Sequence, residues 1–281
     1  MASDGDEIIV APGTYSESIN TLGKAVYLRS SGGPEETVID ASSLSGFNSV
    51  IVITNGEGAD TIIEGFTITG GIGTLISPVT FGGGIYIDGS SPTVLDCIIR
   101  DNFGDVGGGA HSGFGSPLFD GVIFRDNIGA GLDAIASNAE VINSSFINNS
   151  HLNGGGAIHH STSNLKVENS NFRGNSGQGV VVAFLTNTNI AISNSTFCDN
   201  QAEPVIGNWS DLGGNTFAQI CPGESGIGDL NGDGVVNVFD LLLLLEDWGP
   251  CLPRKGSCAA DLTGDNQVNV FDLLILLENW G

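Results

Sequence analysis

The chain has 281 residues, and 40% of them are apolar, which is enough to bury a sizeable core. It carries 32 acidic residues against 8 lysines and arginines, for a formal net charge of −24. This charge repels phosphate backbones and anionic lipid surfaces, and no apolar run is long enough to span a bilayer. Composition therefore excludes nucleic-acid binding and membrane insertion.

The first segments of the chain are short and strand-like. Residues 6–15 read DEIIVAPGTY and residues 63–70 read IEGFTITG, so brief β-prone runs are separated by glycine or proline. Residues 1–6 are polar and acidic, without the charged and then apolar run of an export signal. We expect the chain to begin after such a signal.

Residues 84–200 repeat with a period of about 22–26 residues. A large apolar residue recurs, and an asparagine follows it three positions later each time. The pairs are Ile99 and Asn102, Phe124 and Asn127, Phe146 and Asn149, Phe172 and Asn175, Phe197 and Asn200. Two further short strands complete each period. One opens at Gly84, Gly109, Gly131, Gly156 and Gly179, and the other contains Val94, Phe119, Val141, Val167 and Ile192.

Short strands at this period, without a helical pattern, predict a parallel β-helix in which each turn of chain stacks on the one before. Like residues then lie one above another, about 4.8 Å apart. We expect the asparagines to adopt left-handed turns and to hydrogen-bond as a ladder. The aromatic residues fill the interior. Cys97 falls in an inward column with Val122, Ser144, Ser170 and Ser195.

The opening segments and the repeat resemble right-handed parallel β-helix proteins of the pectin-lyase type, over roughly residues 4–220. The resemblance implies a mostly β, right-handed solenoid and says little about activity. We place this domain at residues 1–222. Residues 208–217 are expected to form a cap or a last irregular coil.

Outward positions on successive coils place Tyr86, His111 and Asp133 in one column, with Asp88 and His160 beside it. If the protein is an enzyme, we expect His111 to be the base, Asp133 its orienting or acidic partner, and Tyr86 a platform for a sugar ring. The alternative is an ordinary solenoid surface. No known catalytic motif of polygalacturonases, pectate lyases or alginate epimerases is present, nor a Gly-x-Ser-x-Gly elbow or phosphate-binding loop.

A second outward column contains three arginines and their acidic neighbours. Its members are Arg100, Arg125, Arg173, Asp101, Asp126 and Asp199. Such arginines can bind uronate carboxylates in a bidentate manner. We favour the alternative, which is lateral Arg–Asp pairing between neighbouring coils.

Residues 229–240 and 261–272 share the pattern of a twelve-residue calcium loop. Side-chain oxygens stand at positions 1, 3, 5, 9 and 12, and position 7 offers its backbone carbonyl. The first set is Asp229, Asn231, Asp233, Val235, Asn237 and Asp240; the second is Asp261, Thr263, Asp265, Gln267, Asn269 and Asp272. Gly234 and Asn266 occupy position 6, where a left-handed turn is needed. Each loop is predicted to hold one Ca²⁺ and to lead into an apolar helix, residues 241–248 and 273–280.

The duplicated loop and helix resemble a type I dockerin, over residues 229–281. This resemblance implies docking to a cohesin-like or cell-surface partner, in two orientations related by the internal two-fold. Family members contact their partner at loop positions 10 and 11, which here are Val238, Phe239, Val270 and Phe271. Thr263 departs from the Asp or Asn usual at position 3. We place this α-helical domain at residues 223–281.

The cysteines and the calcium loops indicate the compartment. We predict disulfides Cys198–Cys221 and Cys251–Cys258 and a free, buried Cys97, although pairing cannot be deduced from sequence alone. Disulfides and weak calcium sites are typical of secreted proteins. Three functions stay open: a calcium-binding structural or carbohydrate-binding β-helix, a lyase or hydrolase of acidic polysaccharide, and an adhesin.

Overall fold

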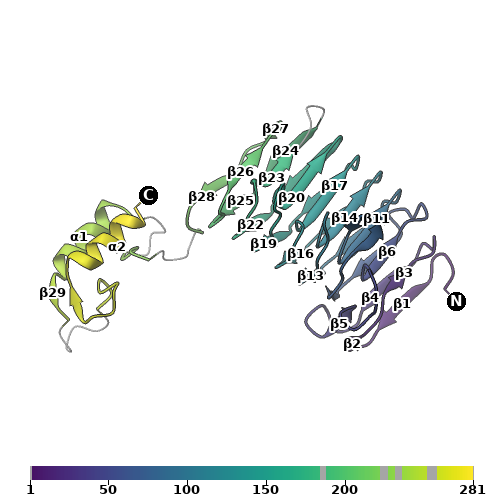
Figure 1. Ribbon diagram of the computed structural model, residues 1–281, viewed down its shortest axis with the longest axis horizontal. Coiled ribbons are helices and arrows are strands. Elements are labelled where there is room, and N and C mark those ends of the chain that lie inside the picture. The colour runs from purple at the N-terminus through teal and green to yellow at the C-terminus, as the bar shows by residue number, and fades with distance from the viewer. Residues whose placement is uncertain (1, 184–187, 222–226, 232–235, 252–257, 281) are drawn as a thin grey trace. The chain divides into compact units, whose positions relative to one another are not determined.

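The computed structural model describes residues 2–183, 188–221, 227–231, 236–251 and 258–280. The chain divides into two compact units, Met1–Phe217 and Ala218–Gly281. The domain boundary predicted from the sequence lies at residues 222/223. The first unit is a coil of short strands, and the second contains the two helices (Figure 1).

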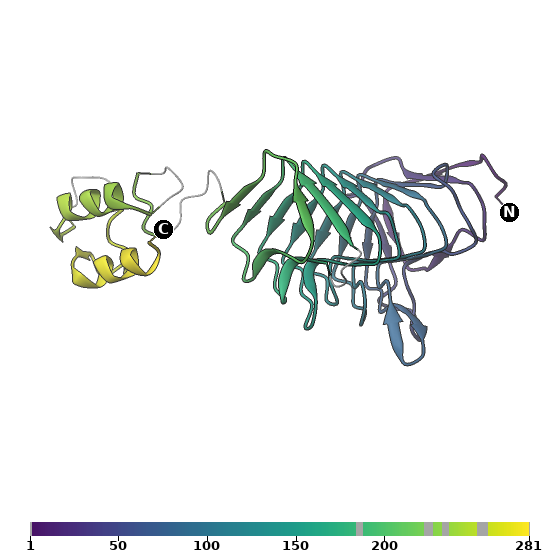
Figure 2. The ribbon, with the colours of Figure 1, turned by 90° about the horizontal axis from the view of Figure 1, so that it is seen from above.

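The first unit is a right-handed parallel β-helix built from three parallel sheets, which confirms the predicted fold (Figures 1 and 2). Sheet A contains β1 (Glu7–Val10), β4 (Tyr27–Ser30), β7 (Ile62–Glu64), β12 (Thr93–Leu95), β15 (Leu118–Asp120), β18 (Glu140–Ile142), β21 (Asn164–Glu168), β24 (Asn189–Ser193) and β27 (Trp209–Asp211). Sheet B contains β2 (Gly13–Tyr15), β5 (Thr37–Asp40), β8 (Thr67–Thr69), β13 (Ile98–Arg100), β16 (Ile123–Arg125), β19 (Ser145–Ile147), β22 (Asn171–Arg173), β25 (Thr196–Cys198) and β28 (Thr216–Ala218). Sheet C contains β3 (Ile19–Asn20), β6 (Ile51–Ile53), β11 (Ile85–Asp88), β14 (Ala110–Gly113), β17 (Leu132–Ile135), β20 (Gly155–Ser161), β23 (Gly179–Ala183) and β26 (Glu203–Ile206).

The interior of the coil is filled by the columns that the repeat predicts. Phe124, Phe146, Phe172 and Phe197 are at most 1% exposed, and their rings stack with centroids 4.6, 5.0 and 4.4 Å apart. Cys97 is free and fully buried, as expected. Burial raises the pKa of its thiol to about 12, so Cys97 is a core residue and not a nucleophile.

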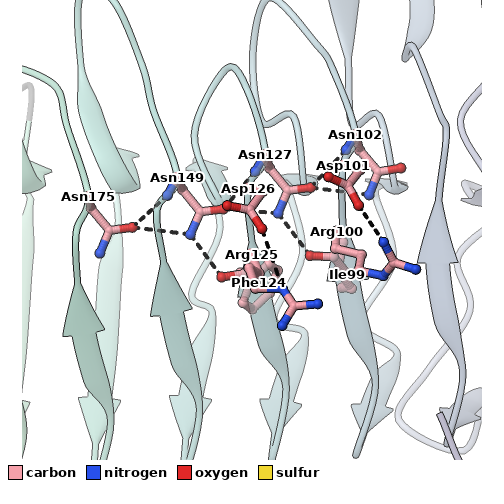
Figure 3. A network of polar contacts seen from close by, with 10 residues as sticks. All are labelled: Ile99, Arg100, Asp101, Asn102, Phe124, Arg125, Asp126, Asn127, Asn149 and Asn175. Carbon is pink, nitrogen blue, oxygen red and sulfur yellow. Dashed lines mark hydrogen bonds and ion pairs between the residues drawn. The ribbon is translucent and has the colours of Figure 1, made fainter. Parts of the chain in front are cut away.

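The asparagine ladder is present between sheets B and C (Figure 3). The Asn102 amide donates to Oδ1 of Asn127 at 3.2 Å, Asn127 to Asn149 at 2.9 Å, and Asn149 to Asn175 at 3.1 Å. The predicted left-handed turn at these asparagines is wrong. The residue before the ladder position takes the positive φ, for example Asp126 at 56°, which frees the asparagine to point inward.

One antiparallel hairpin interrupts the coil between β8 and β11. Strands β9 (Thr74–Ile76) and β10 (Val79–Phe81) stand out from the stack in Figure 2. The backbone N–H and hydroxyl of Thr80 donate to Asp105 at 2.8 and 2.9 Å and tie the hairpin to the next turn. The repeat pattern did not predict this insertion.

The second unit contains α1 (Val238–Glu246), α2 (Val270–Glu278) and the two-stranded pair β29 (Gly249–Pro250) and β30 (Gln267–Val268). Both helices begin three residues earlier than predicted, because Asn237 and Asn269 cap them with their side chains. A small apolar core joins the two halves, with Leu244 and Leu276 fully buried. No helix among the described residues has the length and apolarity to cross a membrane.

Candidate functional site: a histidine–aspartate row and a calcium loop

Sheet C places four side chains in one outward row. The strand register pairs Tyr86 with His111, His111 with Asp133, and Asp133 with His159. The predicted column of Tyr86, His111 and Asp133 is therefore continuous, and His159 extends it by one coil. We call these four residues the His–Asp row.

Asp133 lies at the centre of the row and joins two imidazoles. One carboxylate oxygen contacts Nδ1 of His111 at 2.8 Å, and the other contacts Nδ1 of His159 at 2.7 Å. The side chain is fully buried, which by itself would raise its pKa; hydrogen bonds from both histidines outweigh burial and hold the pKa below its usual range. An ionised carboxylate only accepts hydrogen bonds, so both Nδ1 atoms carry protons. Nε2 of His111 is then the basic atom of that ring.

Aromatic rings enclose His111. Tyr86 stacks on it with centroids 5.6 Å apart and an interplanar angle of 14°, and Phe81 of the hairpin meets its edge at 5.0 Å. Tyr86 is only 7% exposed, so the imidazole occupies one face of the phenol that was expected to serve as a sugar platform. Burial raises the pKa of Tyr86, and it stays protonated at neutral pH.

Gly113 allows a second carboxylate to approach His111. A Cβ at this position would lie 2.8 Å from Oδ1 of Asp88 and 3.3 Å from Nε2 of His111. Both atoms therefore face the same point above the glycine. The arrangement provides an imidazole with a fixed tautomer beside a half-buried carboxylate, which are the elements of general acid–base chemistry.

The prediction that His160 lies beside this column is wrong. His160 points into the core with no exposed surface, and its ring nitrogens lie 2.9 Å from the carbonyl oxygens of Ala134 and Ser163. The reason is the strand register. Leu132 pairs with Ile158, whereas the sequence repeat, which aligns Gly131 with Gly156, pairs Leu132 with Ala157. A slip of one residue moves every side chain to the opposite face of a strand.

His159 and His151 were not predicted as site residues from the sequence. His151 stacks on His159 with centroids 5.5 Å apart. Burial and the neighbouring His159 lower the pKa of His151, so it is uncharged at neutral pH. All four histidines of the chain lie between residues 111 and 160, and this clustering is the signal that could have revealed them.

The arginine column pairs differently from the expectation. Arg100 contacts Asp101 at 2.5 Å and Arg125 contacts Asp126 at 3.4 Å, both within one coil (Figure 3). Only Arg173 reaches a neighbouring coil, at Asp199, 3.7 Å away. These exposed pairs satisfy the guanidinium groups locally, and each contributes little to stability.

The second calcium loop has the geometry of a cation site. Carboxylate oxygens of Asp261, Asp265 and Asp272 lie within 4.8 Å of one another. Asn266 has a φ of 65°, the left-handed conformation predicted at position 6. Thr263 donates its hydroxyl to Asp272 at 2.9 Å, so its oxygen also faces the loop centre. Three carboxylates and a hydroxyl are ligands that suit a hard cation such as Ca²⁺.

Asp272 is buried, which alone would raise its pKa, but backbone N–H groups of Asn269 and Thr263 outweigh this and lower it. In the first loop, Asp240 is equally buried and accepts backbone N–H groups of Leu230, Asn231 and Asn237 at 2.8–3.1 Å. The predicted ligands Asp233 and Val235, together with Gly234, lie outside the described residues. The predicted ligands Asp229 and Asn231 precede that gap and Asn237 follows it.

The two helices expose matching apolar faces. Val238 and Val270 are 51% and 50% exposed, and Phe239 and Phe271 are both 62% exposed. The leucines one and two turns later are similarly exposed on both helices. They are Leu242, Leu245, Leu274 and Leu277. Exposed apolar patches of this kind mark interaction surfaces.

Four cysteines are disulfide-bonded. Cys251 is bonded to Cys258, and Cys198 and Cys221 are also disulfide-bonded, as predicted. Disulfides persist in oxidising compartments outside the cytosol.

Comparisons with known proteins agree with both units. The model of the family "Right handed beta helix region" matches residues 83–237, and that of the "Dockerin type I domain" matches residues 227–279. Similar solved structures include pectin methylesterase from carrot, with 12% identity, a TM-score of 0.40, and coverage of 75% of this chain and 73% of that one. Pectin methylesterase from Yersinia enterocolitica has 9% identity and a TM-score of 0.37, over 74% of this chain and 85% of that one. A search of curated protein sequences finds no match. Because the β-helix model spans more than half of the chain, this protein belongs to the right-handed β-helix family, with a type I dockerin match at its C-terminal end.

Proposed function

We propose that this is a secreted, modular protein whose C-terminal unit, folded around two calcium ions, docks onto a cohesin-like or cell-surface partner. The C-terminal unit then holds the β-helix at the site of the partner. The role of the β-helix is carbohydrate binding or a structural, adhesive function. The observation that carries the docking proposal is the pair of matching apolar faces, because each repeats the same residues at the same exposure on a separate helix.

Calcium holds the loops closed in this proposal. In the second loop, Asp261, Thr263, Asp265 and Asp272 would supply side-chain oxygens, joined by Asn269 and the carbonyl of Gln267. In the first loop the matching positions are Asp229, Asn231, Asp233, Asn237 and Asp240, with the carbonyl of Val235. Metal binding in such small units contributes directly to the free energy of folding.

The partner is expected to be apolar where it meets Val238, Phe239, Val270 and Phe271. Because the two faces carry the same residue types, either helix can make the main contact. Loss of one face should then leave binding through the other. Loss of both should abolish docking, since no third apolar face of this kind exists on the described helices.

The test measures binding of the full chain to a panel of immobilised cohesin modules by surface plasmon resonance, with calcium and with EDTA. The variants Phe239→Asp and Phe271→Asp are expected to weaken binding less than about fivefold each, and the double variant more than about a hundredfold. A matched control is Leu152→Asp, an exposed apolar residue of the β-helix. Calcium-independent binding, or full binding by the double variant, would refute the proposal.

A second candidate function is a polysaccharide lyase or hydrolase that acts on acidic polysaccharide, delivered by the same tail. The specific observation in its favour is the His111–Asp133 contact of 2.8 Å, which fixes a base on the sheet face. In an elimination, Nε2 of His111 would take the C5 proton of a uronide. The C–H electrons would form the C4–C5 double bond as the C4–O4 bond breaks, and the departing oxygen would take a proton from water.

This candidate is tested by incubating the full chain with polyuronides in calcium and measuring the absorbance of unsaturated products. Activity is expected to disappear in His111→Ala and in Asp133→Ala and to persist in the control Asp120→Ala, at a half-buried position in sheet A. The absence of any cleavage by the unaltered chain would remove the candidate without affecting the docking proposal.

A further inference from the structure

A groove of about 500 Å³ follows the turns that lead from sheet B to sheet C. We call it the coil-turn groove. Its lining includes Ile128, Ser150, His151, Leu152, Ser176 and Gln201. This volume falls within the range of about 300–1,000 Å³ that is typical of small-molecule sites. None of these residues belongs to the His–Asp row or to the calcium loops.

Stacking of successive coils builds the groove. Ile128 pairs with Ser150, and Ser150 pairs with Ser176, through isolated parallel bridges between the turns. The backbone N–H groups of Ser150 and Ser176 donate to Asn127 and Asn149, each one coil below. The backbone is thus satisfied by its neighbours, and the hydroxyls are available to a ligand. The lining spans four coils, or roughly 14 Å at about 4.8 Å per coil.

The lining is polar but carries no acidic or basic residue other than His151. Two hydroxyls, one amide and one imidazole offer donors and acceptors, while Ile128 and Leu152 are 56% and 90% exposed and offer apolar contact. The strands of sheet C, on the neighbouring face, also contain no lysine or arginine. A uronate or phosphate would find no lysine or arginine to pair with in the groove, and the net charge of −24 would disfavour its approach.

We propose that the coil-turn groove binds a neutral saccharide segment of about two or three hexose units, aligned across the coils. Its hydroxyls exchange hydrogen bonds with Ser150, Ser176 and Gln201, and its apolar ring faces lie against Ile128 and Leu152. The inference rests on the proposed carbohydrate-binding role of the β-helix and names the ligand class. His151 lines the groove and stacks on His159, so the groove adjoins the His–Asp row.

The test uses the full chain in calcium and isothermal titration calorimetry with cellohexaose, xylohexaose, mannohexaose and hexagalacturonate. We expect binding of at least one neutral hexamer and none of hexagalacturonate. The double variant Ser150→Ala, Gln201→Ala should weaken that binding about tenfold, as expected for two neutral hydrogen bonds. Leu152→Ala, at a residue too exposed to affect folding, should weaken it severalfold. The matched control Ser145→Ala, half-buried on β19 of the same coil and outside the groove, should bind as the unaltered chain does.

Two results would overturn the inference. Neutral-glycan binding that the groove variants leave unchanged, or a preference for hexagalacturonate, would refute the groove while leaving a carbohydrate-binding role for the β-helix. Failure of every saccharide to bind would refute both the groove and that role. The docking of the tail is measured separately with cohesin modules, so its outcome is independent of either result.

Discussion

Replacing Asp133 by Asn tests the His–Asp row most sharply. The carboxylate accepts two hydrogen bonds from imidazoles and has no exposed surface. A hydrogen bond to a charged group contributes about 1.5–3 kcal/mol. Asn keeps one acceptor oxygen, turns an N–H group toward the other histidine, and removes the charge. One contact is then lost and the other weakened, so we expect the β-helix to lose about 2–4 kcal/mol of its free energy of unfolding.

The contribution of Asp133 to stability should decrease at low pH. The pKa of Asp133 is lowered in the folded state, so its contribution is complete above the ordinary Asp value of about 3.9 and is lost as the pH falls toward the folded value. Titration of Asp133 should therefore leave the difference in free energy of unfolding between the unaltered chain and Asp133→Asn constant from pH 5 upward. This difference should become smaller below pH 4.

Urea denaturation followed by circular dichroism, with calcium present throughout, measures the gap. Asp88→Asn is the matched control, because Asp88 is only half-buried, and it should change stability by less than about 0.5 kcal/mol. Equal stability of Asp133→Asn and the unaltered chain at pH 7 would refute the proposed bridging role of the carboxylate.

Two further predictions concern the core of the coil. Asn149→Ala removes four hydrogen bonds from a fully buried ladder position and should lower the free energy of unfolding, measured by urea denaturation, by about 3–5 kcal/mol. The control Asn171→Ala, at an exposed position, should leave it nearly unchanged. Similar losses for both variants would contradict the stabilising role of the ladder. Cys97, with its pKa raised to about 12 by burial, should resist a thiol reagent at pH 8 until the β-helix is unfolded, and rapid labelling of the native protein would show that the core is not closed.

The sequence predicted the coil because its repeats are local and regular. Three columns were aligned correctly from spacing alone, including the stacked phenylalanines and the buried Cys97. The asparagine ladder followed from the same spacing. The positions of the left-handed residues were not predicted correctly. Asp, Asn and Gly all tolerate a positive φ, so neighbouring positions were equally good candidates.

The candidate site was predicted less completely. His111 and Asp133 were placed side by side because their coils keep the expected spacing. His159 was missed because the turn before β20 contains one residue more than the glycine alignment allowed. The hairpin that brings Phe81 onto His111 is an insertion outside the repeat. The coil-turn groove is formed by turns of four coils. Ile128, Ser150, Ser176 and Gln201 each follow a ladder asparagine by one position, but the repeat does not indicate that these positions line a groove.

Peptide-resolved hydrogen exchange in calcium and in EDTA tests the modular account most directly. If calcium supplies the folding free energy of the tail alone, chelation should abolish amide protection across residues 236–251 and 258–280 and leave it unchanged in the strands of sheets A, B and C. Protection of both tail helices that survives EDTA, or loss of protection across the β-helix on chelation, would contradict it.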